Sequence, residues 1–120
     1  MIGVEPETST ALHSGLAAGR SVPVAPLSAA DALNAPFAGE NSLEICQALG
    51  VESVLVSEED LFEAFRWLYQ RTKFAAELGA AASTAALLSG KVQIEPGQTV
   101  VAVVSGGNIA AKQAAAILDS

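Results

Sequence analysis

The sequence predicts an α/β fold with a mainly parallel sheet. Two strand-like runs, residues 51–57 and 99–104, alternate with segments of helical periodicity, and this alternation is typical of parallel sheets. The chain has 120 residues, of which 51% are hydrophobic and 16% charged, so one domain over residues 1–120 can bury a core. Because few strands can be counted, we expect a partial parallel sheet flanked by helices.

The N-terminal segment predicts a strand end followed by a short helix. Residues 1–4 read like the last residues of a strand. Thr8 is a candidate N-cap, Leu12 and Leu16 stand four residues apart, and Gly19 can end the helix. We therefore expect one apolar face on this helix.

A long connection and a second helix come next. Residues 20–41 contain several prolines and no sustained period, which predicts extended chain and loop. An ordered loop of this length often lines a site. Residues 41–50 predict a helix capped by Asn41 or Ser42 and ended by Gly50, and residues 51–57 predict a strand.

The third helix has the clearest start signal in the chain. Ser57 and Asp60 have the spacing of a capping box. Leu61, Phe65 and Leu68 then recur with helical spacing and predict a stripe facing the core.

The C-terminal third predicts a helix, a strand and a last helix. Residues 77–90 form an alanine-rich helix ended by Gly90, whose small side chains would allow close approach to a sheet. Residues 99–104 are a continuous apolar run, as expected of a strand buried on both faces. The last helix should cover about residues 109–118.

Charge and composition exclude several classes of function. The net charge is −7 and the six lysines and arginines are scattered, which opposes binding to nucleic acid. The longest uncharged stretch is shorter than the roughly 20 apolar residues that a membrane span needs. The N-terminus lacks the pattern of a signal peptide, so we expect a cytoplasmic location. Cys46 reads as a small core residue and His13 as an exposed helical residue, with no zinc cluster.

The segment Ser105–Asn108 follows the apolar run as a glycine turn. In open α/β sheets, ligands bind beyond the carboxyl ends of strands, where glycine lets backbone amides come close and a helix N-terminus favours anions. The pattern S-G-G-N is common, and no dinucleotide or P-loop motif accompanies it. A ligand site and a plain tight turn therefore remain alternatives on spacing alone.

Four segments, taken together and in order, carry a resemblance to a known family. They read "GVEPETSTAL", "SAADALNAPFAGE", "VESVLVSEEDLFEAFRWLYQRTKFAAELGAAASTAALLSGK" and "VVAVVSGGNI". The chain resembles the C-terminal part of the large domain of threonine/serine dehydratases, which are fold-type II (tryptophan synthase β-like) enzymes that use pyridoxal 5′-phosphate (PLP). The resemblance implies PLP as cofactor and ammonia-lyase chemistry as activity.

The resemblance also implies roles for the glycine turn. In the family, the residue that matches Ser105 offers its hydroxyl to the pyridine nitrogen, which moderates the cofactor as an electron sink. Gly106 and Gly107 would let the backbone pass close to the ring, and Asn108 matches the turn residue of the motif. We therefore predict Ser105, Gly106, Gly107 and Asn108 as cofactor-binding residues.

Several positions depart from the family pattern. Glu5 matches a carboxylate that ligates a divalent cation in some relatives, but Ala11 stands where a second carboxylate would be, so we predict no metal site. Ala32 and Ala80 occupy positions that are glycine in the family motifs. A Cβ at these positions narrows the backbone freedom near the expected cofactor edge.

The catalytic lysine and the phosphate-binding loop of the family precede the region that this chain matches. Lys73, Lys91 and Lys112 match no Schiff-base motif, so we predict no catalytic residues. Three hypotheses follow. We favour a stand-alone, non-catalytic, self-associating fragment, which would form a homo-oligomer to hide its incomplete sheet. The alternatives are a part of a split PLP-dependent lyase completed by an N-terminal partner chain, and an inert truncation product.

Overall fold

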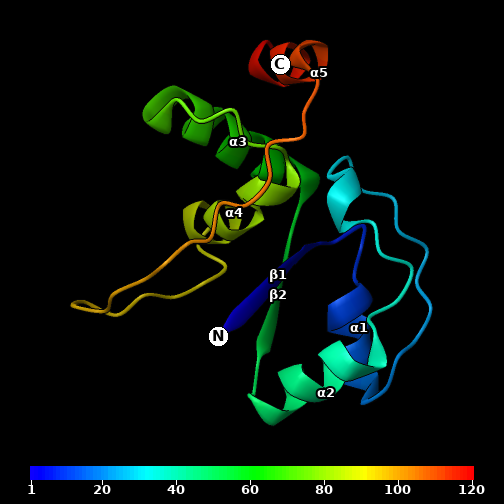
Figure 1. The fold of residues 1–120 in the computed structure, drawn as a ribbon. Coiled ribbons are helices and arrows are strands. Elements are labelled where there is room, and N and C mark those ends of the chain that lie inside the picture. The colour runs from blue at the N-terminus through cyan, green and yellow to red at the C-terminus, as the bar shows by residue number, and fades with distance from the viewer.

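Two parallel strands form the sheet. The computed structural model describes all residues from 1 to 120, and strand β1 (Ile2–Pro6) pairs with β2 (Glu52–Val56) with Val4 opposite Val54 (Figure 1). The residues at the N-terminus that were expected to end a strand therefore belong to the paired strand β1. The α/β class and the parallel sheet are confirmed.

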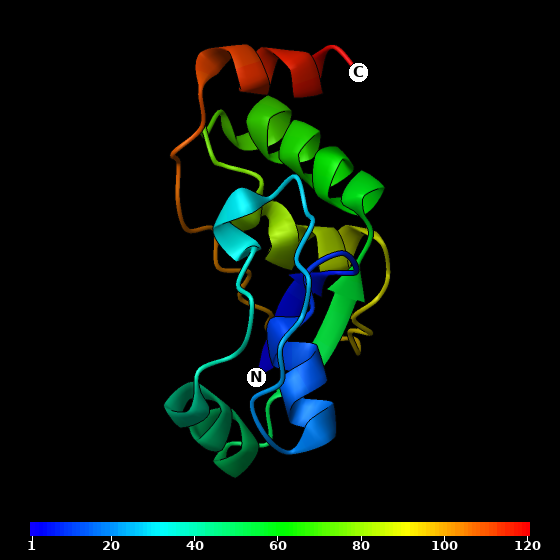
Figure 2. The same ribbon diagram turned by 90° about the vertical axis from the view of Figure 1, so that its right-hand side faces the viewer.

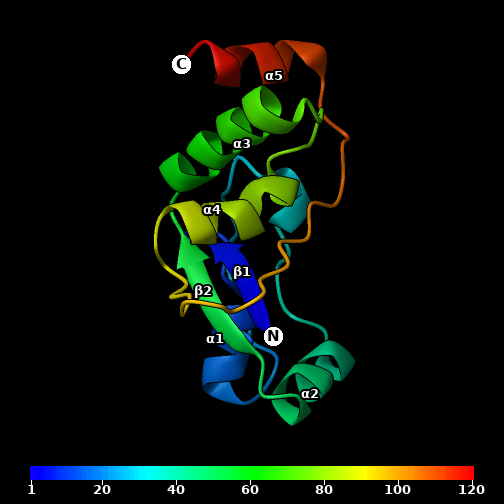
Figure 3. The same ribbon diagram turned by 90° about the vertical axis from the view of Figure 1, so that its left-hand side faces the viewer.

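Helices cover both faces of this sheet. Helix α1 (Ala11–Ala18) lies on one face, where a Cβ at Gly3 would come within 2.9 Å of the Leu12 Cδ2 atom. Helix α4 (Ala82–Leu88) lies against both strands on the other face (Figure 3). The sheet is therefore flanked by helices, as the sequence predicts, because a parallel sheet has two apolar faces to bury.

Helix α2 (Glu40–Ala48) packs on α1 at the end of the molecule away from α3 (Figure 1). Its buried Leu43 lies on Gly15, where a Cβ would be 2.5 Å from the Leu43 Cδ1 atom. Cys46 is only partly buried. The expectation that Cys46 is a core residue is therefore wrong, because α2 offers the core little more than Leu43.

Helix α3 (Glu58–Thr72) begins with the predicted capping box. The Ser57 hydroxyl accepts a hydrogen bond from the Asp60 amide at 3.1 Å, and the Asp60 carboxylate accepts one from the Ser57 amide at 2.9 Å. Leu61, Phe65 and Leu68 are all buried, which confirms the predicted stripe.

The core lies where α4 fits between α3 and the sheet. A short 3₁₀ turn, η2 (Gly79–Ala81), leads into α4, and together they bury a run of alanines and Thr84. Figure 2 shows the successive layers of α5 (Ala111–Leu118), α3, α4 and the sheet. Ile117 of α5 is buried and joins the same core. None of the helices has the length and hydrophobicity that crossing a bilayer requires.

The helices α1 and α2 begin at other residues than those predicted. The N-cap of α1 is Thr10 instead of Thr8, because the Thr8 hydroxyl donates to the Glu58 carboxylate and is not available as a cap. The N-cap of α2 is Gly39, ahead of both predicted capping residues. Three C-terminal signals are confirmed: Gly19, Gly50 and Gly90 all take the positive φ typical of helix ends.

The predicted strand at residues 99–104 is wrong. This segment is extended but unpaired, and its backbone amides donate no hydrogen bond within the chain. Val101 is 81% exposed and Val103 68% exposed, so the run is not buried either. A strand exists only with a neighbour to pair with. This segment passes α4 (Figure 1) and is separated from the start of β1 by a groove, with no backbone hydrogen bond to β1.

The core makes a direct stability prediction. We expect Phe65→Ala to lower the free energy of unfolding by about 3–5 kcal/mol, because the ring is fully buried and its removal leaves a cavity. Phe74→Ala, at a position that is 67% exposed, is the matched control and should change it by less than about 1 kcal/mol. Urea unfolding followed by circular dichroism measures both. Equal losses in the two variants would contradict this assignment of the core.

Candidate functional site

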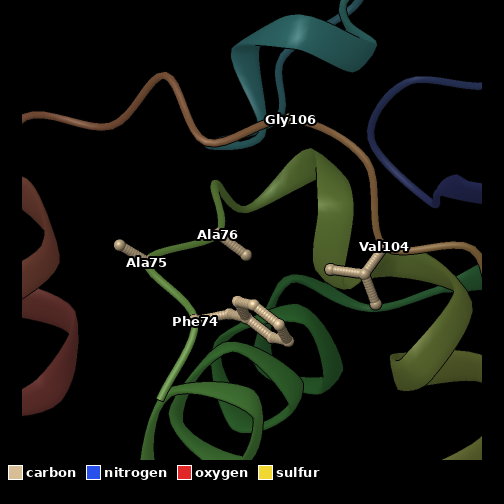
Figure 4. A pocket seen from close by; sticks show the side chains of 5 residues that line it. All are labelled: Phe74, Ala75, Ala76, Val104 and Gly106. Atoms are coloured by element: carbon tan, nitrogen blue, oxygen red, sulfur yellow. The ribbon is translucent and has the colours of Figure 1, made fainter. Parts of the chain in front are cut away.

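The glycine turn Ser105–Asn108 lies against the segment that joins α3 to η2. The Glu77 amide donates to the Gly106 carbonyl at 3.2 Å, and the Glu77 carboxylate accepts from the Asn108 amide at 2.8 Å. The turn is therefore held on both sides of Gly107 by a single residue. Figure 4 shows the chain at Gly106 passing over this segment.

Both glycines of the turn are required by the packing of the chain itself. Gly106 has a φ of +84°, and a Cβ there would be 2.6 Å from the Glu77 Oε1 atom. A Cβ at Gly107 would be 3.0 Å from the Ala75 carbonyl oxygen. A larger residue at either position would push the turn off residues 75–77.

The turn offers several polar groups without a partner in the chain, which are the backbone amides of Ser105, Gly106 and Gly107 and one side-chain hydroxyl. The Ser105 hydroxyl is exposed and makes no hydrogen bond within the chain, so it is available to a ligand. The backbone amide of Asn108, by contrast, already donates to the Glu77 carboxylate. Helix α5 begins only at Ala111, so its N-terminus does not form part of the turn.

A small apolar cavity lies on one side of the turn. Its volume is about 190 Å³, and the residues that line it are Phe74, Ala75, Ala76, Val104 and Gly106 (Figure 4). Ser105 is not among them, although both of its neighbours are. Ser105 is therefore not part of the lining of this cavity.

Two further motif segments lie side by side near the turn. The 3₁₀ turn η1 (Asp31–Leu33) packs on η2, where a Cβ at Gly79 would be 3.5 Å from the Ala32 Cβ and 3.4 Å from the Leu33 Cγ. Neither Ala32 nor Ala80 takes a positive φ, since Lys73 is the only non-glycine residue that does. The two alanines that stand at the family's glycine positions therefore fit without backbone strain.

Glu5 serves as a cap for a helix. Its two carboxylate oxygens accept hydrogen bonds from the Leu12 and His13 amides, each at 2.8 Å. The carboxylate thereby satisfies two amides in the first turn of α1. His13 is half-buried, and its ring lies 3.2 Å from the Ser53 hydroxyl, so the expected exposed histidine is wrong. The predicted absence of a metal site stays a prediction.

None of the three lysines lines the cavity beside the turn. Lys73 is the exposed C-cap of α3, where its φ of 63° ends the helix. Lys91 lies 3.8 Å from the Glu7 carboxylate, and Lys112 is exposed in the first turn of α5.

Sequence reasoning missed Glu58, which ties the long loop to the core. Its carboxylate accepts hydrogen bonds from the Thr8 hydroxyl and, at 3.0 Å, from the Ala29 amide. Partial burial raises the pKa of Glu58, but hydrogen bonds from Thr8, Ser28 and Ala29 outweigh that effect and lower the pKa below its ordinary value of 4.5. The capping-box pattern identified the start of α3, but no sequence pattern identified Thr8 and Ala29 as the partners of Glu58.

The structure defines an α/β fold with a glycine turn after an extended apolar segment, and comparison with known proteins gives the family. Residues 1–106 match the family described as pyridoxal-phosphate dependent enzyme, and the chain belongs to this family. Its identity to the catabolic L-threonine dehydratase TdcB of Staphylococcus aureus (strain N315) is 43% over 82 residues, which are 67% of this chain and 24% of that protein.

Solved structures give the same relationship. A threonine deaminase from T.th. is 35% identical with a TM-score of 0.80, over 91% of this chain and 40% of that one. The L-serine ammonia-lyase of Rhizomucor miehei is 25% identical with a TM-score of 0.84, over 98% of this chain and 38% of that one. The chain is thus similar to a portion of threonine and serine dehydratases, and it spans about a quarter of the length of the first of these relatives.

The lowered pKa of Glu58 predicts a pH-dependent contribution to stability. A carboxyl whose pKa is lower in the folded state stabilises the fold above its ordinary pKa of 4.5, and this contribution is lost as the pH falls through the folded value. We expect Glu58→Gln to be less stable than the wild type at pH 7, with the difference shrinking below about pH 4.5. Urea unfolding at several pH values measures this, with the exposed Glu63→Gln as control. A difference that does not change with pH would refute the prediction.

Proposed function

We propose that this chain by itself is a non-catalytic, self-associating module with the fold of a threonine/serine dehydratase. The observation that carries the proposal is the row of exposed backbone amides at residues 99–107, which donate to nothing within the chain. Such a row pairs readily with a strand of another molecule. Lys73, Lys91 and Lys112 match no Schiff-base motif of the family, which supports the non-catalytic part of the proposal.

A second copy of the chain is the partner that we propose. The segment 99–104 exposes four valines beside these amides; they are Val100, Val101, Val103 and Val104. A groove of about 870 Å³ lies between this segment, the start of β1 and helix α4. Two copies related by a two-fold axis can pair this segment antiparallel with itself, which satisfies the amides and covers the valines.

The mass in solution tests this proposal. Light scattering across a range of concentrations should give a dimer or larger assembly for the wild type. The double variant Val101→Lys and Val103→Lys should shift it to the monomer, because like charges would face each other across the two-fold axis. Leu27→Lys, at a site in the long loop that is 83% exposed, is the matched control and should leave the mass unchanged. A wild type that is monomeric throughout would overturn the proposal.

A second candidate function is a part of a PLP-dependent lyase whose lysine and phosphate cradle come from other segments. The free Ser105 hydroxyl favours it, because a hydroxyl can face the ring nitrogen of the cofactor. The Ser105 hydroxyl thus fits one edge of the ring, but the Asn108 amide is bound to Glu77 and is not open to the phosphate. The phosphate loop and the Schiff-base lysine would come from the other segments. PLP, when bound, would supply the electron sink for ammonia elimination.

Co-expression with a polypeptide that carries a family lysine and glycine-rich loop tests the second candidate. We expect ammonia and a 2-oxo acid from L-threonine or L-serine only when both polypeptides are present. Ser105→Ala should lower this activity about tenfold or more, the scale of losing one hydrogen bond to the reacting group. Ser42→Ala, an exposed serine in α2, is the control. No activity in the pair, together with an oligomeric wild type, would favour the non-catalytic module.

A further inference from the structure

The segment that carries the glycine turn is attached to the rest of the molecule at few points. Between residues 99–110 and the preceding chain there are hydrogen bonds through only two residues, Glu77 and Ser83. The Ser83 hydroxyl donates to the Val103 carbonyl at 2.8 Å, ahead of the turn. Every hydrogen bond between the turn itself and the preceding chain is made with Glu77, which donates one and accepts one.

Glu77 is well placed to impose a geometry on the turn. Its neighbours Ala76 and Leu78 are 5% and 3% exposed, and its carbonyl accepts from the Ala80 amide at 3.1 Å at the start of η2. The turn, in contrast, is exposed throughout. The position of Glu77 is therefore set by the core, and the turn follows it.

The contacts of Glu77 cover the turn from Gly106 to Asn108. Its amide binds the Gly106 carbonyl, its Oε1 atom fills the space that a Gly106 side chain would need, and its Oε2 atom binds the Asn108 amide. An amide bound to a carboxylate is a charge-assisted hydrogen bond, stronger than one between neutral groups. The carboxylate also takes the place of any external anion at the Asn108 amide.

We propose that Glu77 is a positioning residue, which fixes the backbone of the Ser105–Asn108 turn and thereby the direction of the Ser105 hydroxyl. Segment 76–80 is held by the core and sets the position of Glu77. Gly106 and Gly107 lie against residues 75–77 because they have no side chain. The use of this hydroxyl by a cofactor rests on the second candidate function. The positioning of the turn backbone by Glu77 does not depend on that function and is argued only from the contacts given above.

Amide hydrogen exchange measured by NMR tests this inference without PLP or substrate. We expect Glu77→Ala to speed exchange of the Asn108 amide by about tenfold or more, because its acceptor is lost. Glu77→Gln keeps an oxygen acceptor and should restore part of the protection. Glu63→Ala, which removes an exposed carboxylate from α3, is the control and should leave Asn108 unchanged.

The amide of Phe65, in the core of α3, separates positioning from general stability. The inference requires that Glu77→Ala accelerates Asn108 and leaves Phe65 exchange unchanged. It is overturned when both amides accelerate equally, or when Glu77→Ala and Glu63→Ala give the same Asn108 rate. Because cofactor and partner polypeptide are absent from the samples, failure of either proposed function leaves this result intact, and light scattering on the same samples reports the assembly state.

Discussion

The close packing of helix α4 between the sheet and α3 is the constraint on which the rest of the structure depends. Ala85 and Ala86 are 0% and 1% exposed, and side chains of one carbon let the helix approach both neighbours at once. Val56 and Phe65, on either side, then fill the remaining space. The segment from Glu77 to Gly79 leads directly into this packed helix, so the place of the candidate site relative to the sheet is set by the same contacts.

Local signals in the sequence predicted the parts of the fold that local physics determines. The capping box at Ser57, the stripe from Leu61 to Leu68 and the terminal glycines depend on residues within one or two helical turns. The predicted cap at Thr8 failed for a long-range reason, since Glu58 takes its hydroxyl. The predicted strand at 99–104 failed in the same way: apolar β-branched residues favour an extended chain, but pairing requires a neighbour that composition cannot report.

The candidate site shows the same division. The glycine turn was visible as a pattern, but in the structure residues 105–108 form no assigned turn or bend, and Gly106 alone among them takes a positive φ. The partner of the turn was not visible, because Glu77 lies about thirty residues earlier and nothing in the local sequence links the two. The pattern suggested amides open to an anion. The structure instead gives the backbone amide of Asn108 to an internal carboxylate, while the Ser105 hydroxyl and the backbone amides of Ser105, Gly106 and Gly107 have no partner in the chain.

Ser105 lies between a part of the chain that has hydrogen-bond partners within the molecule and a part whose backbone amides have none. On its C-terminal side, Glu77 fixes the backbone through contacts within the chain. On its N-terminal side, the row of amides from residue 99 onward has no internal partner. A strand that pairs with this row, from a second copy or from a complementing polypeptide, would order the remaining side of Ser105 as well. The proposed association would therefore be coupled to the direction of the hydroxyl, because the unpaired segment leads directly into the turn that contacts Glu77.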